Sequence, residues 1–151
     1  SKSCIYALRS ILFIAHNASV DSKVGIKEVA LALDLPTHYL GKILQQLSKN
    51  GIIQSIKGPH GGFYLNEVSK NVKIIRIIEV VDGLDFFNQC GLGLSQCSDD
   101  HPCPIHNDFK VCRDGLLTLF SSKSIEDFLL SRQDIAEYVG LTSNQITKVF
   151  F

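Results

Sequence analysis

The sequence predicts a mainly α-helical protein that carries one small β-hairpin and one long additional helix. Two observations lead to this prediction. Apolar residues recur at helical spacing in several separate segments of the chain. Two short β-type runs, 52–57 and 63–65, flank a turn that is rich in glycine. The length of 151 residues is enough for one domain with a proper apolar core.

The composition limits the classes of protein to which the chain can belong. We expect no membrane partner, because no apolar run is long enough to span a bilayer and no secretory-type start is present. The five cysteines are an odd number, and four of them lie between positions 90 and 112. This clustering argues against a secreted disulfide framework and favours metal or redox use in a reducing compartment. We therefore expect a cytoplasmic protein.

The zero net charge conceals two oppositely charged halves. Residues 1–76 contain ten Lys and Arg against four Asp and Glu, a net charge of +6, and residues 77–151 carry the balancing −6. A basic half favours contact with a polyanion through that half alone. Without the motifs described below, the alternative is that the asymmetry is solvated surface charge distributed by chance.

Three helices are expected in the basic half, over residues 2–16, 26–33 and 36–49, the last ending at Asn50-Gly51. The apolar positions expected to be buried are Ile5, Leu8, Leu12 and Ala15 in the first helix, Ile26, Val29, Ala30 and Leu33 in the second, and Leu40, Ile43, Leu44 and Leu47 in the third. The third helix then leaves a polar face outward, formed by Thr37, His38, Lys42, Gln45 and Gln46.

A sharp turn at Asp34-Leu35-Pro36 separates the second and third helices. Asp34 stands where the turn needs a left-handed backbone, a conformation that Gly, Asn and Asp tolerate. Two helices joined in this way, with the second polar on its exposed face, form a helix-turn-helix, in which the second helix reads the major groove of DNA.

The glycine-rich turn 58–62 follows this helix pair and joins two predicted strands. Its glycines permit positive φ angles and a close approach of the backbone. A hairpin directly after a recognition helix is the wing of a winged helix, and Lys57 and His60 at its tip are placed to reach a phosphate or the minor groove. An ordinary hairpin whose glycines serve only the turn is the alternative.

The acidic half is predicted to contain one helix over 72–81 and a second from His106 or Asn107 to Phe120. The second helix has an apolar surface too broad for one contact, made by Phe109, Val111, Cys112, Leu116, Leu117 and Phe120. Such a surface indicates more than one packing partner for this helix, although a core helix within one subunit has the same pattern.

Four candidate metal ligands lie between the two helices, with the spacing C-x6-C-x5-C-x2-H: Cys90, Cys97, Cys103 and His106. Their loop is glycine-rich, polar and broken by proline, so a bound group rather than apolar packing is expected to order it. Thiolates with one imidazole suit an iron–sulfur cluster or zinc. A thiol-based redox switch and passive loop cysteines are the alternatives. We expect Asp99 and His101 to be solvated, and Cys4 and Cys112 to pack as small apolar residues.

Several motifs together resemble the IscR/NsrR-type (Rrf-type) winged-helix transcription regulators, most closely the IscR branch. They are Tyr6-Ala7-Leu8-Arg9, Val29-Ala30, Tyr39-Leu40, the turn Lys57–Leu65, with Lys57 where arginine is usual, and the three cysteines. The resemblance implies a homodimer that binds a near-palindromic operator in double-stranded DNA, under control of a cluster held by Cys90, Cys97, Cys103 and His106. In the IscR branch a histidine three residues after the last cysteine completes a 2Fe–2S centre, and Cys103-Pro104-Ile105-His106 repeats that step. The NsrR branch instead has an aspartate ligand where this chain has Ile5, so the resemblance favours 2Fe–2S over 4Fe–4S.

We expect DNA contacts from Thr37, His38, Tyr39, Lys42 and Gln45 of the recognition helix and from Lys57, Gly58, His60 and Gly61 of the wing. We expect four regions: a winged helix-turn-helix over 1–83, a cluster loop over 84–106, a dimerisation helix region over 107–131, and a tail over 132–151 that resembles a second helix-turn-helix. The alternative functions are a zinc-bound or thiol-switch repressor and an electron-transfer protein. No catalytic motif is present, so no enzyme is expected.

Overall fold

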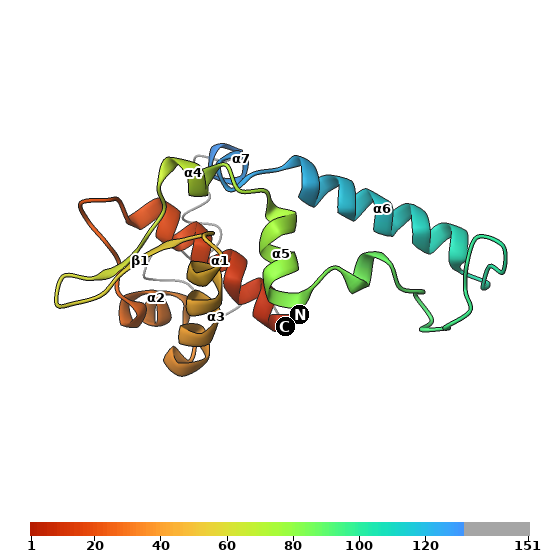
Figure 1. Cartoon of the computed structure of the whole chain (residues 1–151), viewed down its shortest axis with the longest axis horizontal. Coiled ribbons are helices and arrows are strands. Elements are labelled where there is room, and N and C mark those ends of the chain that lie inside the picture. The colour runs from red at the N-terminus through yellow and green to blue at the C-terminus, as the bar shows by residue number, and fades with distance from the viewer. Residues whose placement is uncertain (132–151) are drawn as a thin grey trace.

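A computed structural model describes residues 1–131 and consists of a compact body from which a long arm projects (Figure 1). The body comprises residues 1–83 and 123–131, and the arm comprises residues 84–122. The elements of the body are α1 (Lys2–Asn17), α2 (Ile26–Leu33), α3 (Thr37–Lys49), β1 (Gln54–Ile56), β2 (Gly62–Tyr64), α4 (Glu67–Lys70), α5 (Ile74–Asp82) and α7 (Ile125–Leu130). Those of the arm are the 3-10 turn η1 (Asp85–Phe87) and α6 (His106–Ser122). The prediction of a mainly α-helical fold with one small hairpin is confirmed.

The body is held together by apolar side chains that α1, α2, α3 and α5 bury between them. The predicted stripe of α3 is confirmed, since Leu40, Ile43, Leu44 and Leu47 are all buried. Full burial of one such side chain contributes about 1.5–3 kcal/mol. The polar positions that α3 was predicted to expose are exposed.

The predicted buried face of α1 is only partly correct, because Leu12 is buried and Leu8 and Ala15 pack against the core, whereas Ile5 does not. Ile5 is 55% exposed, whereas Ala7, Ile11 and Ile14 are almost completely buried. The run from Ile11 to Ile14 is apolar on every side, so periodicity alone does not single out one face. Contacts with α2, α3, α5 and α7 select the face that is buried.

The turn between α2 and α3 has the predicted left-handed residue. Asp34 has φ 51° and ψ 52°, and it is the one non-glycine residue with positive φ in the described part of the chain. The backbone N–H of Leu35 donates to the Ala30 carbonyl oxygen at 2.9 Å, which closes the turn. This geometry sets α3 across α2 in the helix-turn-helix arrangement.

The hairpin is antiparallel, with Gln54 opposite Tyr64 and Ile56 opposite Gly62. The first strand is shorter than predicted, because Ile52 and Ile53 enter the apolar core before β1 begins, and the second is as long as predicted but begins one residue earlier. Gly58 has φ 113°, and a Cβ on Gly61 would lie 2.2 Å from the Ile56 carbonyl oxygen, so the turn requires glycine at both positions.

The chain returns from the arm to the body directly after α6. The Ile74 N–H donates to the Lys123 carbonyl oxygen at 2.9 Å, and the Ile125 N–H donates to that of Val72 at 3.0 Å. Ile125 is fully buried, so α7 belongs to the body. The expected region 107–131 therefore contains two helices, of which only α6 lies in the arm. The tail 132–151 lies outside the described residues. No helix in the described part of the chain is long and apolar enough to cross a membrane.

Candidate metal centre

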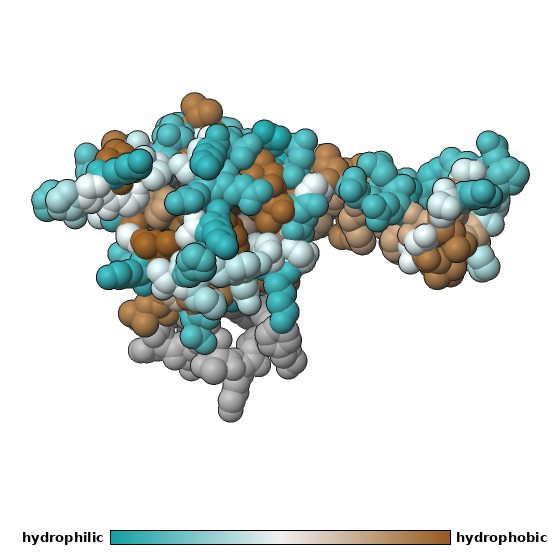
Figure 2. Space-filling view, turned by 60° about the horizontal axis from the view of Figure 1, so that its bottom comes forward, coloured by the Kyte–Doolittle hydropathy of each residue, from teal (hydrophilic) through white to brown (hydrophobic). Residues whose placement is uncertain are grey.

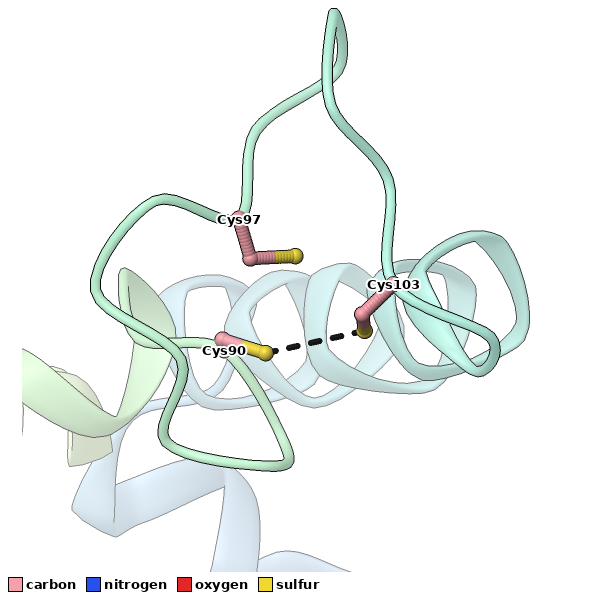
Figure 3. A group of neighbouring side chains, drawn as sticks. All are labelled: Cys90, Cys97 and Cys103. Carbon is pink, nitrogen blue, oxygen red and sulfur yellow. Dashed lines mark hydrogen bonds between the residues drawn. The ribbon is translucent and has the colours of Figure 1, made fainter.

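The arm brings its three cysteines together at one point. Cys90 follows η1, Cys97 lies in the middle of the loop, and Cys103 lies just before α6. Their three Sγ atoms are all within 4.8 Å of one another, and the sulfurs of Cys90 and Cys103 are 3.6 Å apart. Figure 3 shows the three thiols turned toward the same space beside α6. Positions separated by thirteen residues in the sequence are thus gathered into one candidate ligand set.

The loop that carries the cysteines is ordered by turns and not by burial, since none of residues 88–123 is buried. The Gly93 N–H donates to the Cys90 carbonyl oxygen at 2.9 Å, and Ser98 and His101 exchange backbone hydrogen bonds of 3.2 Å. Gly91 packs so closely on the Phe109 ring that a Cβ there would lie 2.9 Å from it. These contacts fix the loop against α6 without any apolar core.

His106, in the first turn of α6, lies beside the cysteines. Its Nδ1 is 3.1 Å from Cys97 Sγ, and its Nε2 is 2.9 Å from Asp99 Oδ1. The Lys110 ammonium donates to both oxygens of the same carboxylate at 2.7 Å. The side chain of His106 is only 12% exposed. The structure therefore places the fourth predicted ligand next to one cysteine, with its other nitrogen held by an acidic residue.

The surroundings of Cys90 and Cys97 shift the pKa values of these two thiols in opposite directions. The backbone N–H groups of Leu94 and Leu92 stabilise the thiolate of Cys90 and lower the pKa of this thiol to about 7. At Cys97 the backbone N–H of Cys103 acts to lower the pKa, but desolvation and the neighbouring thiols outweigh it and raise the pKa. Thiolates are the form in which cysteine binds metal, and near neutral pH Cys90 is closer to this form than Cys97 is.

The donor set fits a metal centre. A pocket of about 280 Å³ is lined by Cys90, Cys97, Cys103 and His106, together with Phe109, Lys110 and Arg113 among others. Two sulfurs that bind one tetrahedral metal ion at about 2.3 Å lie about 3.8 Å apart. The separation of 3.6 Å between Cys90 and Cys103 is close to this value. Three sulfurs and one nitrogen suit either an iron–sulfur cluster or zinc.

The predicted DNA-contacting side chains lie on two neighbouring elements, α3 and the hairpin. Thr37, His38, Lys42 and Gln45 are exposed on α3, and Lys57, Gly58 and His60 are exposed at the tip of the hairpin, with Gly61 partly buried beside them. Tyr39 differs from the rest of the set. Its ring packs edge-on against Tyr6 with the centroids 6.0 Å apart, and its hydroxyl is hydrogen-bonded to Ser3 Oγ. Tyr39 therefore ties the start of α3 to α1.

Sequence reasoning missed three features of these sites. Asp99 was expected to be a solvated residue, yet it bridges His106 and Lys110 while remaining 71% exposed. The spacing of four residues between His106 and Lys110 puts them on one face of a helix and was the signal available in the sequence.

Cys112 is exposed, contrary to expectation, because α6 has no neighbour on that side within the described chain. Cys4 is buried as expected. Gln46 Nε2 donates to the Val80 carbonyl oxygen and joins α3 to the last turn of α5.

The chain is similar to known transcription regulators along most of its length. Residues 1–149 match the model of the Rrf2 family, described as an iron-dependent transcriptional regulator. An HTH-type transcriptional regulator of Aquifex aeolicus is 31% identical over 126 residues, which cover 82% of this chain and 86% of the relative. The HTH-type transcriptional regulator IscR of Photorhabdus laumondii is 25% identical and covers 92% of this chain and 83% of its own.

Solved structures share the fold. CymR, the global cysteine regulator of B. subtilis, has a TM-score of 0.69 at 21% identity, with 87% of this chain and 96% of that chain covered. IscR of T. potens has a TM-score of 0.66 at 20% identity, with 87% and 85% covered. The winged-helix architecture expected from the sequence is thus confirmed, and the matched family and relatives are regulators rather than enzymes.

Proposed function

This chain belongs to the Rrf2 family of transcriptional regulators, and on that premise we propose that it is a dimeric, sequence-specific DNA-binding protein whose operator affinity is controlled by an iron–sulfur cluster. The observation that carries the proposal is the convergence of three cysteine sulfurs within 4.8 Å in an arm attached to a winged helix. We assign Cys90, Cys97, Cys103 and His106 as the ligands. We favour 2Fe–2S, because the fourth candidate ligand is an imidazole and not a fourth thiolate.

The body supplies the DNA-binding surface of the proposed regulator. Exposed polar side chains of α3 are available to base edges in the major groove, and Lys57 and His60 of the hairpin are available to phosphates or the minor groove. The charge of +6 over residues 1–76 favours approach to DNA. Such a protein works in the cytoplasm, where its DNA is.

The arm supplies the proposed dimer contact. Helix α6 buries no residue within one chain and exposes a stripe formed by Cys112, Leu116 and Leu119, at intervals of four and three residues. Two copies of this stripe related by a two-fold axis would cover each other. Two winged helices set in this way suit a near-palindromic operator.

The DNA-binding body and the cluster-binding arm of the proposed regulator are connected through the last turn of α5, after which the arm begins. This turn is bonded to α3 through Gln46 and Val80, and to the start of α1 through Ser1 Oγ and Asp82. When bound, a cluster would supply an iron- and redox-dependent link among its four ligands. Ordering of the loop by that link biases the position of α5 and therefore of α3, with a coupling of about 1–3 kcal/mol.

The first test is an anaerobic visible and Mössbauer spectrum of the purified protein, with assays of iron and sulfide. We expect a 2Fe–2S signature in the wild-type protein and in Cys112→Ser, which changes a cysteine outside the ligand set. Cys97→Ser should lose the signature. Its affinity should also change, by about 5- to 150-fold, for a DNA fragment selected from a random pool by the wild-type protein. A wild-type protein that stays colourless after anaerobic reconstitution would exclude the cluster.

A thiol switch is the second candidate, and the separation of 3.6 Å between the sulfurs of Cys90 and Cys103 favours it. Oxidation by a peroxide would take two electrons and two protons from these thiols and form one disulfide, while the peroxide is reduced to water. In that case a colourless, zinc-free protein should form the Cys90–Cys103 bond on peroxide treatment and change its DNA affinity. A colourless protein that contains stoichiometric zinc would indicate a zinc-bound repressor.

A further inference from the structure

We propose that Asp99, held in place by Lys110, is a positioning residue that fixes the orientation and tautomer of His106, so that Nδ1 of this ring faces the cysteine group. The inference rests on the proposed function, since it deepens the role of one assigned ligand. It assigns a function to two side chains, Asp99 and Lys110, that supply no ligand themselves.

The geometry around His106 gives its two ring nitrogens different partners. Nδ1 is 3.1 Å from Cys97 Sγ, and Nε2 is 2.9 Å from Asp99 Oδ1. The ring is only 12% exposed and lies in the first turn of α6, and in this orientation each nitrogen has its own partner. The hydrogen bond between His106 Nε2 and the Asp99 carboxylate therefore orients the ring.

The chemistry of the carboxylate fixes the tautomer. An ionised carboxylate only accepts hydrogen bonds, so Nε2 must carry a proton to bond with it. In the neutral imidazole the proton on Nε2 leaves the lone pair on Nδ1, and that lone pair is the one that binds metal. Metal-binding histidines commonly donate their other N–H to a carboxylate, which orients the ring and raises its basicity.

Lys110 holds the carboxylate in this position. It follows His106 by one helical turn, and its Nζ donates to both oxygens of Asp99 at 2.7 Å. Asp99 lies in the polar loop segment between Cys97 and Cys103. Without Lys110, its only hydrogen bond to α6 would be the one to His106. Lys110 thus keeps the loop carboxylate next to the helix that carries the ligand.

The next residue offers a matched control. Asp100 has the same side chain and is exposed in the same loop, but it makes no hydrogen bond or ion pair to any part of the chain that the structure describes. Asp99→Leu and Asp100→Leu remove the same charge from adjacent positions, and Asp99→Glu retains an acceptor-only carboxylate. Lys110→Met removes only the residue that holds Asp99.

The first experiment uses the cluster-free protein and reads the tautomer directly by ¹⁵N NMR of the imidazoles, at a pH where they are neutral. His106→Gln assigns the His106 signals by their loss. We expect a single Nε2–H tautomer in the wild type, Asp100→Leu and Asp99→Glu, and a mixture in Asp99→Leu. Lys110→Met should give an intermediate result. An Nδ1–H or mixed wild-type ring, or an unchanged ring in Asp99→Leu, would overturn the proposal.

The second experiment reads the consequence for the bound group. Anaerobically reconstituted Asp99→Leu should release iron to a chelator on the order of 10- to 100-fold faster than the wild type, and Asp100→Leu should match the wild type. Equal release rates from the two leucine variants would contradict a positioning role. A wild-type protein that takes up no iron or sulfide refutes the proposed function instead, and the NMR result then still decides the tautomer.

Discussion

The body and the arm of this molecule are ordered by different means. In the body, helices such as α3 and α5 each bury three or four large apolar side chains. In the arm, by contrast, no residue from 88 to 122 is buried, and the loop is shaped by turns, hydrogen bonds and ion pairs at its surface. Figure 2 shows apolar surface on the arm as well as on the body, and the exposed apolar side chains of the arm are Phe86, Leu92, Leu94, Ile105, Val111, Leu116 and Leu119.

The contrast between body and arm indicates where control of this protein can act. The body has a continuous apolar core, and apolar burial is the main favourable term in folding. Apart from Phe87, the arm buries no side chain within one chain, and turns and polar contacts shape its loop. A metal group at the cysteines and a second copy along α6, as proposed above, would add to that order. A structure whose sensing region is ordered by a ligand can respond to loss of that ligand without unfolding the DNA-binding region.

The largest effect that tests this comparison is expected in the body. Leu44→Ala removes a fully buried side chain from α3 and should lower the free energy of unfolding by about 2–5 kcal/mol, measured by chemical denaturation. Leu31→Ala is the matched control on α2, where the side chain is 84% exposed, and should change it by less than about 0.5 kcal/mol. If the two substitutions lowered the free energy of unfolding equally, burial of apolar side chains would not be what stabilises the body.

A smaller effect is expected in the arm, and on association rather than on folding of the body. Leu119→Ala shortens an exposed side chain of α6, so the dimer dissociation constant should rise on the order of 10- to 100-fold, because each interface contains the residue twice. Sedimentation across a range of concentrations measures it, with Leu31→Ala again as the control. If Leu119→Ala leaves the dissociation constant unchanged, α6 is not the dimer contact and the arm must be ordered by the loop alone.

The same division explains what the sequence could predict. The bounds of α2 and the left-handed Asp34 followed from local rules, because apolar period and turn chemistry act over a few residues. Spacing and resemblance predicted that the three cysteines form one ligand set, but not how close their sulfurs lie. Their distances depend on turns in the loop and on Phe109 packing against Gly91, which no periodicity encodes.

Errors arose where long-range packing decides. The buried face of α1 could not be chosen within its uniformly apolar run, since several helices from distant parts of the chain select it. Helix α7 was not predicted as a separate element, because the whole of 107–131 was assigned to one dimerisation region. Its place becomes evident only from the backbone bonds that Lys123 and Ile125 make with residues 72–74.

The smallest predicted effect sharpens the boundary between the two regions at α7. Ser124 Oγ accepts from the Asp127 N–H at 3.1 Å, and Asp127 Oδ2 accepts from the Ser124 N–H at 2.7 Å, so the two residues form a capping box at the return point of the arm. Ser124→Ala should cost about 0.5–2 kcal/mol of stability. Ser121→Ala, in the exposed last turn of α6, is the control and should be nearly neutral.

Hydrogen exchange locates that loss. The amides of Ile74 and Ile125 bond across the junction between the arm and the start of α5, so their exchange should accelerate in Ser124→Ala. The Leu44 amide, in the middle of α3, should exchange faster only by the change in global stability. If all three amides accelerate equally, α7 unfolds together with the whole body and the junction is part of its cooperative unit. Selective acceleration at Ile74 and Ile125 would place the boundary at Lys123, where the chain leaves the arm, shaped by turns and polar contacts, and enters the body, ordered by burial.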